Sequence, residues 1–323
     1  MRPTIKGSSI LVTGGAGFIG SHLVDRLLAE KAKEIVIIDN MFLGNEANID
    51  FAKRHGNVVL YKDDAELNSS LQYIFDRHRI DIVFNAATKA LNYSFVNPAN
   101  AFKTNVNVII NLLELLRKKA FNTLCHFSTS EVYGTAQYEP MDESHPTNPT
   151  TTYAAGKHAA DIAVQSYVKM FDLDAFIVRP FNNYGPRQNS EGYLAGVIPI
   201  TARRILNGEQ PEIHGTGDQT RDFIYVLDTV DAIISLYDRM EPGTSVNIST
   251  DGQIAIKDVI FKIMDMLEYQ GDVIYKEVRK ADVECHNASN AKIRSMIEYR
   301  LTPFEKGLRN TIEWYKKQIR ATP

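Results

Sequence analysis

The stretch from Ser9 to Gly20 reads SILVTGGAGFIG, and it decides the expected fold. Its first five residues are mostly apolar and predict a short buried strand, while the glycines after Thr13 predict a tight turn. Leucines recur at helical spacing beyond Phe18, which predicts a helix directly after the turn. A strand, a glycine turn and a helix in this order are typical of the start of a parallel α/β sheet.

The glycine turn also has the chemistry of a dinucleotide site. Glycines let backbone N–H groups approach a pyrophosphate, and the helix N-terminus adds partial positive charge. A second predicted strand, Glu34–Ile38, ends in Asp39, whose carboxylate can accept hydrogen bonds from a ribose and would repel a 2′-phosphate. The sequence therefore predicts NAD rather than NADP, and a bare structural turn is the alternative. The expected cofactor contacts in this part of the chain are Gly14, Gly17, Phe18, Ile19, Gly20, Asp39 and Asn40.

Two further strands are predicted at Val58–Tyr61 and Ile82–Asn85. Ligands of such sheets lie at the carboxyl ends of the parallel strands. We therefore place Asp64 near the adenine and the backbone of Ala86 and Ala87 near the ribose of the cofactor. Asp64 could equally cap the helix that follows it.

The regular alternation of strand and helix ends after a predicted strand at Ala175–Val178. We expect an NAD-binding Rossmann domain over residues 1–178, built on a doubly wound parallel sheet. A segment near 222–250 is expected to return to that sheet through a strand at Val246–Ile248. Residues 179–323 are expected to form a smaller α/β substrate domain.

Composition excludes several classes of protein. The 323 residues are 44% hydrophobic and 23% charged with a net charge of −3, so no basic field points to nucleic acid or an anionic membrane. Two cysteines, Cys125 and Cys285, make neither a disulfide framework nor a four-ligand zinc site, and no metal site is expected. No uncharged apolar stretch approaches the roughly 18 residues of a membrane span. We expect a cytoplasmic protein.

The catalytic candidates lie in two short motifs. FSTSEVYG runs on from a predicted strand at Leu124–Phe127, and TYAAGK begins a helix some twenty residues later. Tyrosine is a poor base until a cation favours its phenolate, and Lys157 lies one helical turn from Tyr153. Thr129 could hydrogen-bond the same substrate hydroxyl. The expected catalytic residues are Thr129, Ser130, Glu131, Tyr153 and Lys157, of which Tyr153 and Lys157 would also contact the cofactor. A surface Tyr–Lys helix pair is the alternative.

Together with NNYGP from Asn182 and RDFIYV from Arg221, these motifs resemble the extended short-chain dehydrogenase/reductase superfamily over nearly the whole chain. The resemblance is to its nucleotide-sugar epimerases, dehydratases and decarboxylases. It implies tightly held NAD, a Thr–Tyr–Lys catalytic set and a nucleoside diphosphate sugar as substrate. It also implies a homodimer through a four-helix bundle formed by the helices Phe102–Lys118 and Tyr153–Phe171.

Substrate contacts are expected at Lys89, Asn182, Arg187, Arg221 and Arg279. The resemblance assigns Asn182 to the sugar phosphate and Arg221 to the diphosphate, whose oxygens suit an arginine fork. Arg279 departs from the family pattern, because Lys-Ala-Asp follows it in place of Pro-Gly-Asp. For each arginine, a solvated side chain in a structural ion pair is the alternative.

Ser130 and Glu131 bear on which reaction follows the oxidation of C4. An epimerase rotates the 4-keto sugar and needs no second acid–base pair, whereas a 4,6-dehydratase needs a base for the C5 proton and an acid for the C6 hydroxyl. Glu131 fits the base. Glucose 4,6-dehydratases have an Asp before it, and Ser130 resembles the GDP-mannose dehydratases instead. A serine is too weak an acid alone, so protonated Glu131 or a water held by Ser130 would act.

The sequence-based prediction is an NAD-dependent nucleoside diphosphate sugar 4,6-dehydratase. The Ser–Glu pair also resembles UDP-glucuronate decarboxylases, for which Lys89, Arg187 and Arg279 are candidate cations facing the C6 carboxylate. A C4-epimerase and a non-catalytic NAD(H)-binding regulator are further alternatives. A surface position for Glu131 would weaken the dehydratase prediction.

Overall fold

The computed structural model describes residues 2–278 and 285–321, and their side chains as far as residue 319. At its centre seven parallel strands follow the order β11-β6-β5-β4-β1-β2-β3. The strand order reverses between β1 and β4, which defines a doubly wound Rossmann sheet. The strands are β1 (Ser9–Thr13), β2 (Glu34–Ile38), β3 (Val58–Tyr61), β4 (Ile82–Asn85), β5 (Thr123–Phe127), β6 (Ala175–Pro180) and β11 (Ser245–Ile248).

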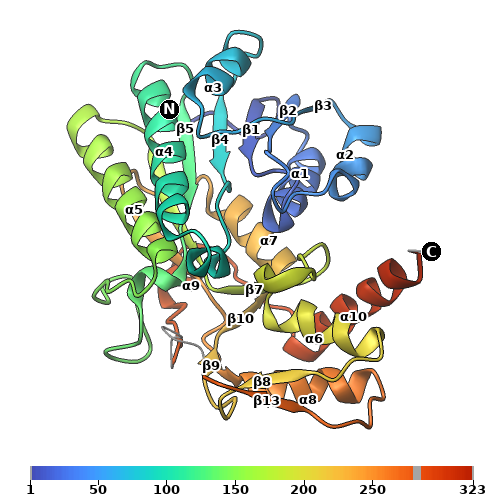
Figure 1. The fold of residues 1–323 in the computed structure, drawn as a ribbon. Coiled ribbons are helices and arrows are strands. Elements are labelled where there is room, and N and C mark those ends of the chain that lie inside the picture. Colours follow the sequence, from blue (N-terminus) through green and yellow to red (C-terminus); the bar gives the residue numbers. More distant parts are fainter. Residues whose placement is uncertain (1, 279–284, 322–323) are drawn as a thin grey trace.

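Helices cover both faces of the sheet (Figure 1). One face packs against α3 (Asn68–Phe75), α4 (Pro98–Arg117) and α5 (Thr152–Phe171) through one buried apolar cluster. The other packs against α1 (Phe18–Ala29), α2 (Asp50–His55) and α7 (Val226–Leu236) through a second cluster. Burial on both faces explains why the strands are nearly continuous apolar runs in the sequence.

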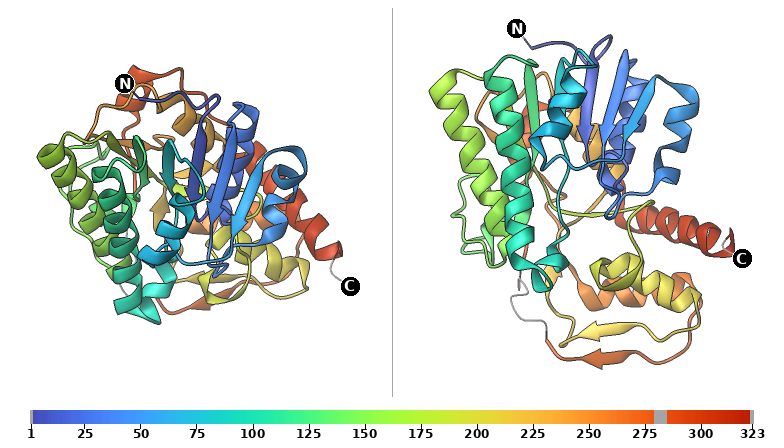
Figure 2. Two further views of the ribbon diagram at one scale, coloured as in Figure 1. Left: turned by 90° about the horizontal axis from the view of Figure 1, so that it is seen from above. Right: turned by 45° about the horizontal axis from the view of Figure 1, so that its top comes forward.

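A smaller layer lies beyond one end of the sheet (Figures 1 and 2). This layer has an apolar cluster of its own, which includes Ile198, Val259 and Leu308. The half-buried Trp314 packs against that cluster. Its helices are α6 (Val197–Leu206), α8 (Ile256–Met266) and α10 (Phe304–Ala321), and its strands β8 (Glu212–His214) and β13 (Ile274–Lys276) pair in parallel. Short pairs connect the two layers: β7 (Asn182–Tyr184) with β10 (Phe223–Tyr225), and β9 (Thr220–Arg221) with β12 (Ile254–Ala255).

The remaining elements are short. They are the helix α9 (Ala291–Met296) and the 3₁₀ turns η1 (Glu46–Ile49), η2 (Leu91–Phe95), η3 (Ser130–Tyr133) and η4 (Gly192–Leu194). The largest error in a predicted boundary is at α4, which begins at Pro98 rather than at Phe102. Asn97 accepts a hydrogen bond from the Asn100 N–H group, and a proline at the first helical position already has helical φ, so the helix starts a turn earlier.

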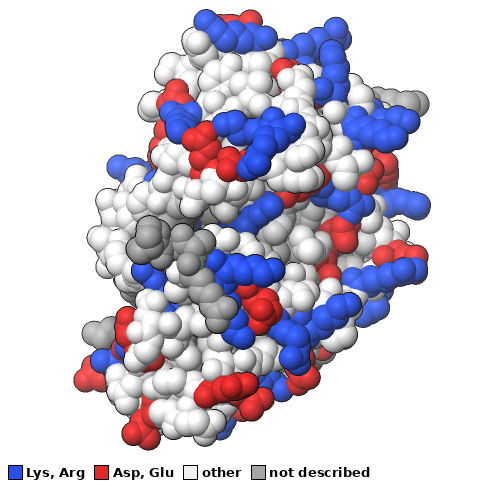
Figure 3. Space-filling view, turned by 90° about the vertical axis from the view of Figure 1, so that its right-hand side faces the viewer, with Lys and Arg blue, Asp and Glu red and all other residues white. Residues whose placement is uncertain are grey.

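No described helix is long and apolar enough to span a membrane. Within residues 2–278 and 285–321, no group of three or more His, Cys, Asp or Glu side chains is arranged to hold a metal ion. Both Cys125 and Cys285 are free thiols, and Cys125 is buried. Positive and negative side chains are interspersed on the face shown in Figure 3, so that face carries no field of a single sign.

Candidate active site

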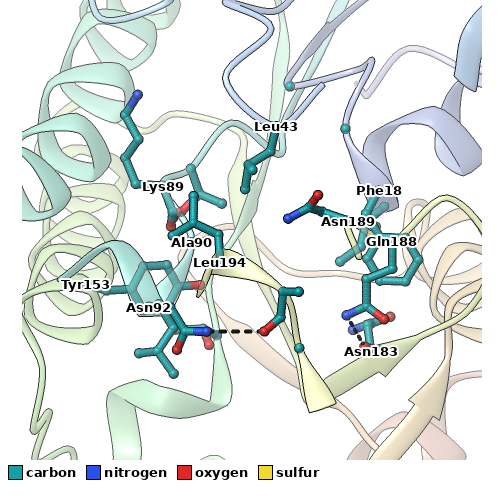
Figure 4. A pocket seen from close by; sticks show the side chains of 18 of the residues that line it. Phe18, Leu43, Lys89, Ala90, Asn92, Tyr153, Asn183, Gln188, Asn189 and Leu194 are labelled. Atoms are coloured by element: carbon teal, nitrogen blue, oxygen red, sulfur yellow. Dashed lines mark hydrogen bonds between the residues drawn. The ribbon is translucent and has the colours of Figure 1, made fainter. Parts of the chain in front are cut away.

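A cavity of about 560 Å³ lies between the carboxyl ends of the sheet strands and the smaller layer. Every predicted site residue that the structure describes lines it, although Arg279 lies outside the described residues. Beside the cavity, the Asn92 amide of η2 donates a hydrogen bond to the Ala195 carbonyl oxygen across from it (3.4 Å; Figure 4). The size and mixed polar lining suit small-molecule ligands.

The turn between β1 and α1 leaves room for a ligand because it lacks side chains. A Cβ on Gly14 would lie 2.9 Å from the Ala87 Cα atom, and one on Gly20 would lie 2.1 Å from the Gly14 carbonyl oxygen. Gly14 also has φ of +69°, a left-handed conformation that favours glycine. No side chain caps the start of α1 at Gly17, so its first N–H groups are available to a pyrophosphate.

Asp39 ends β2 at the cavity wall, and backbone groups fix its carboxylate. One oxygen accepts from the Ala16 N–H group (3.0 Å) and the other from the Met41 N–H group (2.9 Å). Burial raises the pKa of Asp39, and these backbone hydrogen bonds oppose that rise. Each carboxylate oxygen can accept a second hydrogen bond, so the residue suits ribose hydroxyls.

Asp64 does not cap the helix that follows it, because the N-cap position of α3 is Leu67. It lines the cavity, where its Oδ2 atom accepts from the Asn40 amide (2.8 Å). Its Oδ1 atom accepts from the Glu66 N–H group (2.9 Å) in the turn before α3. Asn40 and Asp64 therefore form one hydrogen-bonded wall beside Asp39. These residues and the glycine turn fit an NAD molecule.

Tyr153 stands at the start of α5, where Thr151 caps the helix by accepting from the Ala154 N–H group (3.2 Å). Its ring projects into the cavity (Figure 4). Burial raises the pKa of Tyr153 to about 12, and the negative charge of Glu131 adds to the rise. Hydrogen bonds with Thr129 and Thr88 act in the opposite direction. The phenol is therefore held next to Thr129, as a pair acting on one hydroxyl requires.

Lys157 is only 2% exposed, which contradicts a surface Tyr–Lys pair. Its ammonium donates a hydrogen bond to the Phe127 carbonyl oxygen at the end of β5 (2.8 Å). Burial lowers the pKa of Lys157 to about 8, and the charge of Asp161 opposes this. Burial therefore has the largest influence on the pKa of both Tyr153 and Lys157. A second positive charge in the cavity would lower the pKa of Tyr153.

Asp161 is buried one helical turn beyond Lys157 and is held by two donors. The Ser128 hydroxyl donates to its Oδ2 atom (2.9 Å), and the Arg179 guanidinium forms an ion pair with the same atom (3.0 Å). Buried charges persist only when they are paired and hydrogen-bonded. This network joins β5, α5 and β6 and fixes the charge next to Lys157.

Ser130 and Glu131 begin η3 directly after Thr129. The Thr129 hydroxyl oxygen accepts from the Glu131 N–H group (3.2 Å) and so sets the turn that directs both residues. Ser130 is 3% exposed and Glu131 is 8% exposed. A solvated surface position for Glu131 is therefore wrong, and its carboxylate shares the cavity with Tyr153.

His286 lies next to Glu131, and no sequence motif indicated this contact. The ring is fully buried, with Nδ1 3.8 Å from the Glu131 Oε1 atom and Nε2 3.1 Å from the Gly134 carbonyl oxygen. It follows Gly134 by 152 residues and belongs to no recognisable motif. Only the folded chain reveals this contact.

Two predicted substrate cations have protein partners. Lys89 places its ammonium 4.1 Å from the centre of the Phe42 ring, and Figure 4 shows it extending away from Tyr153. Arg187 forms an ion pair with Asp25 of α1 (2.7 Å). Both line the cavity, yet neither side chain is directed at the phenol by the contacts that hold it.

Asn182 and Arg221 fit a phosphate group better. The Asn182 side-chain nitrogen is buried and has no hydrogen-bond partner among the described residues, so a donor is left available. Arg221 is 8% exposed and donates from Nη1 to the Thr220 carbonyl oxygen (2.9 Å), which fixes the position of the guanidinium. Both line the cavity beside the smaller layer.

Comparison with known proteins defines the class. The model of the NAD dependent epimerase/dehydratase family matches residues 10–249. The chain is 30% identical to a UDP-glucose 4-epimerase of Mycolicibacterium smegmatis, covering 95% of this chain and 98% of the relative. It is 29% identical to UDP-glucuronic acid decarboxylase 1 of Xenopus tropicalis, covering 96% and 72% respectively. A dTDP-glucose 4,6-dehydratase of Bacillus anthracis, solved with NAD, superposes with a TM-score of 0.87 at 27% identity, covering 97% and 98%.

The chain belongs to the NAD dependent epimerase/dehydratase family. Its fold is that of an extended short-chain dehydrogenase/reductase, and NAD is its cofactor. Members with this architecture modify sugars attached to nucleoside diphosphates, and the three relatives named here carry out three different reactions by name.

Proposed function

We propose that the protein is an NAD-dependent nucleoside diphosphate sugar 4,6-dehydratase. One observation carries this proposal: the buried carboxyl group of Glu131 lines the same cavity as the phenol of Tyr153. An epimerase that only moves a hydride has no use for such a group. A dehydratase needs it for the C5 proton.

The first step is the oxidation of C4 by the oxidising half of the cavity, which we define as Thr129, Tyr153 and Lys157. The Tyr153 phenolate accepts the proton of the C4 hydroxyl, and Thr129 orients that hydroxyl by a hydrogen bond. A bound NAD would supply the hydride acceptor for C4, the hydride donor for C6 and a positive nicotinamide whose charge favours the phenolate.

The second step is the loss of water, carried out by the eliminating half of the cavity, which we define as Ser130 and Glu131. The C4 ketone acidifies the C5 proton, and the Glu131 carboxylate accepts it. The C5–C6 double bond forms as the C6–O bond breaks, and the protonated Glu131 gives its proton to the departing oxygen. C6 gains the hydride taken from C4, and C5 gains the proton that Tyr153 took from the C4 hydroxyl. The atoms therefore balance as one molecule of water and a 4-keto-6-deoxy sugar.

The contacts of the candidate cations favour dehydration over decarboxylation. A decarboxylase should present a cation to the C6 carboxylate of its substrate. Lys89 instead stacks on Phe42, and Arg187 is paired with Asp25. Arg279, the third candidate cation, lies outside the described residues. The Glu131 carboxyl group and the Thr129 and Ser130 hydroxyls line the cavity with Tyr153 and suit proton transfer.

C4-epimerisation is the second candidate, because a relative at 30% identity is named an epimerase. The oxidising half would suffice for that reaction, and Glu131 would then take no part in the chemistry. The binding-only alternative has less support, since a regulator has no need for the Tyr153 and Glu131 arrangement. Arg221 and Asn182 would hold the diphosphate in each enzymatic case.

The mass of the product tests the proposal. The purified protein is incubated with UDP-, GDP-, CDP- and dTDP-sugars, including glucuronate and N-acetyl forms. We expect a product lighter by about 18 Da, the mass of water, whereas a loss of about 44 Da means decarboxylation and an unchanged mass with a new isomer means epimerisation. Bound NAD without turnover of any sugar would support a regulator instead.

We also propose that the protein is a homodimer through α4 and α5. These helices pack side by side on the sheet and expose large apolar side chains to the outside, at Phe102, Ile162, Met170 and Phe171. Several exposed apolar side chains on a helix pair are typical of a subunit interface. Light scattering of the purified protein should give twice the mass of one chain, and an Ile162→Glu, Met170→Glu variant should be monomeric.

A further inference from the structure

The contacts of His286 fix which of its ring nitrogens carries hydrogen. Its Nε2 atom lies 3.1 Å from the Gly134 carbonyl oxygen, and a carbonyl can only accept a hydrogen bond. Nε2 must therefore be the donor. In a neutral ring the other nitrogen, Nδ1, then carries a lone pair and can only accept.

The surroundings of His286 keep the ring neutral. It is fully buried, and the Phe181 ring packs edge-on against it with centroids 6.0 Å apart. Burial lowers the pKa of His286 to about 3, and the charges of Arg221 and His145 add to this, while its bond to Gly134 opposes it. Nδ1 has no hydrogen-bond partner among the described residues. An acceptor is thus held in place without a donor.

The group that faces this acceptor is Glu131, whose Oε1 atom lies 3.8 Å from Nδ1. An ionised carboxylate cannot donate a hydrogen bond, so its negative oxygen and the lone pair of Nδ1 would repel each other. A protonated carboxyl group can donate, and a small rotation of the side chain would close the distance to a hydrogen bond. The neutral imidazole therefore stabilises the protonated form of Glu131 over the ionised form.

We propose that His286 is a positioning residue that accepts a hydrogen bond from Glu131 once Glu131 has taken a proton. This inference rests on the proposed dehydratase function. The proton comes from C5 as the C5–H bond breaks and the Oε–H bond forms. His286 holds the carboxyl group in one orientation until the proton passes to the C6 oxygen, which leaves as water. The imidazole gains and loses no proton in this sequence.

Two variants of the NAD-loaded protein test this pairing. His286→Gln can keep the donation to the Gly134 carbonyl while removing the acceptor that faces Glu131. His286→Asn places an amide near the position of Nδ1, where its N–H group can donate to the ionised carboxylate. The pKa of Glu131 is followed by NMR with ¹³C-labelled glutamate, and Glu131→Gln identifies the signal. His145→Gln is the matched control, because His145 is another buried histidine and its Nε2 atom accepts from the Gln137 N–H group.

We expect the pKa of Glu131 to fall by about one unit in His286→Gln and further in His286→Asn. The water-loss step should slow by about tenfold, since a weaker base removes the C5 proton, while the rate of C4 oxidation stays the same. His145→Gln should leave the Glu131 signal unchanged. An unchanged Glu131 pKa in either His286 variant that keeps its bound NAD would overturn the pairing.

The same data separate this inference from the dehydratase proposal. If the wild-type protein releases no water from any sugar nucleotide but the Glu131 pKa falls in both His286 variants, the pairing is correct and the proposed reaction is wrong. If water is released and the pKa is unchanged, the reaction is correct and His286 has only a packing role.

Discussion

The oxidising and eliminating halves of the cavity meet at Thr129, yet they depend on different lengths of chain. The oxidising half is built by β5 and the next helix, α5, whose first turn places Tyr153 beside Thr129. The eliminating half lies in η3, but the residue that faces Glu131 is His286, from the C-terminal part of the chain. The first depends on neighbouring elements and the second on a long-range contact.

This difference bears on how one fold serves several reactions. The chemistry that we propose for the oxidising half is one that an epimerase, a dehydratase and a decarboxylase would all need. The imidazole that faces Glu131 comes from a segment far along the chain, separate from the glycine turn and α5. Reaction type can therefore vary without loss of cofactor binding.

The largest expected effect comes from Tyr153→Phe, which should abolish both sugar oxidation and the water loss that follows it. The variant lacks the group that takes the C4 proton, so turnover should fall by about 10² to 10⁴-fold. Adding substrate should no longer change the absorbance of the bound nicotinamide. Normal water loss by this variant would mean that the two halves do not act in sequence.

Lys157→Met tests the burial of the charge in the oxidising half. The pKa of Lys157 is about 8 in the folded protein, and a lysine in an unfolded chain titrates near about 10.4. Between these values the unfolded chain binds more protons, so Lys157 makes the free energy of unfolding rise with pH in this window.

The methionine variant lacks that contribution. The wild type should therefore gain on the order of 3 kcal/mol relative to Lys157→Met as pH rises from about 8 to about 10.4, with no change in the difference below this range. Urea unfolding at several pH values measures it. Parallel pH curves for the two proteins would show that Lys157 is not desolvated.

Arg221→Ala and Arg187→Ala compare two arginines of one cavity. Arg221 should bind the diphosphate that both halves need in place, so its loss should raise KM by about tenfold or more. Arg187 is paired with Asp25, and its loss should change KM by no more than about threefold. Steady-state kinetics with the sugar nucleotide that the product-mass assay identifies measures both KM values. A larger rise in KM for Arg187→Ala than for Arg221→Ala would exchange the two roles.

Ser130→Ala should give the smallest effect and sharpens the account of the eliminating half. If Glu131 alone returns the proton to the C6 oxygen, water loss should slow by less than about tenfold. A fall comparable to that of Tyr153→Phe would show that a water held by Ser130 is the acid. The rate of C4 oxidation serves as the internal control.

The sheet was predictable because its strands are buried on both faces. Periodicity placed β1, β2 and β3 at the bounds observed, and β11 pairs with β6 close to the segment expected to return. The start of α4 was less predictable, because the capping by Asn97 competes with the apolar pattern that marks the helix.

The site was predictable where one motif carries all its members. Thr129, Ser130 and Glu131 are consecutive, and the helix α5 fixes the spacing between Tyr153 and Lys157. The contact partners of the site residues were not predictable, because a partner can come from any part of the chain. His286 facing Glu131, Asp25 holding Arg187 and Phe42 beneath Lys89 all depend on contacts that only the folded chain defines.

The central claim is that Glu131 separates water loss from sugar oxidation. Glu131→Gln keeps the shape of the side chain and removes the base, so the NAD-loaded variant should still reduce its bound cofactor when substrate is added. Stopped-flow absorbance of the nicotinamide with mass spectrometry of the quenched sugar follows both events. We predict reduced cofactor and no product lighter by about 18 Da. Water loss at the wild-type rate would contradict the assignment.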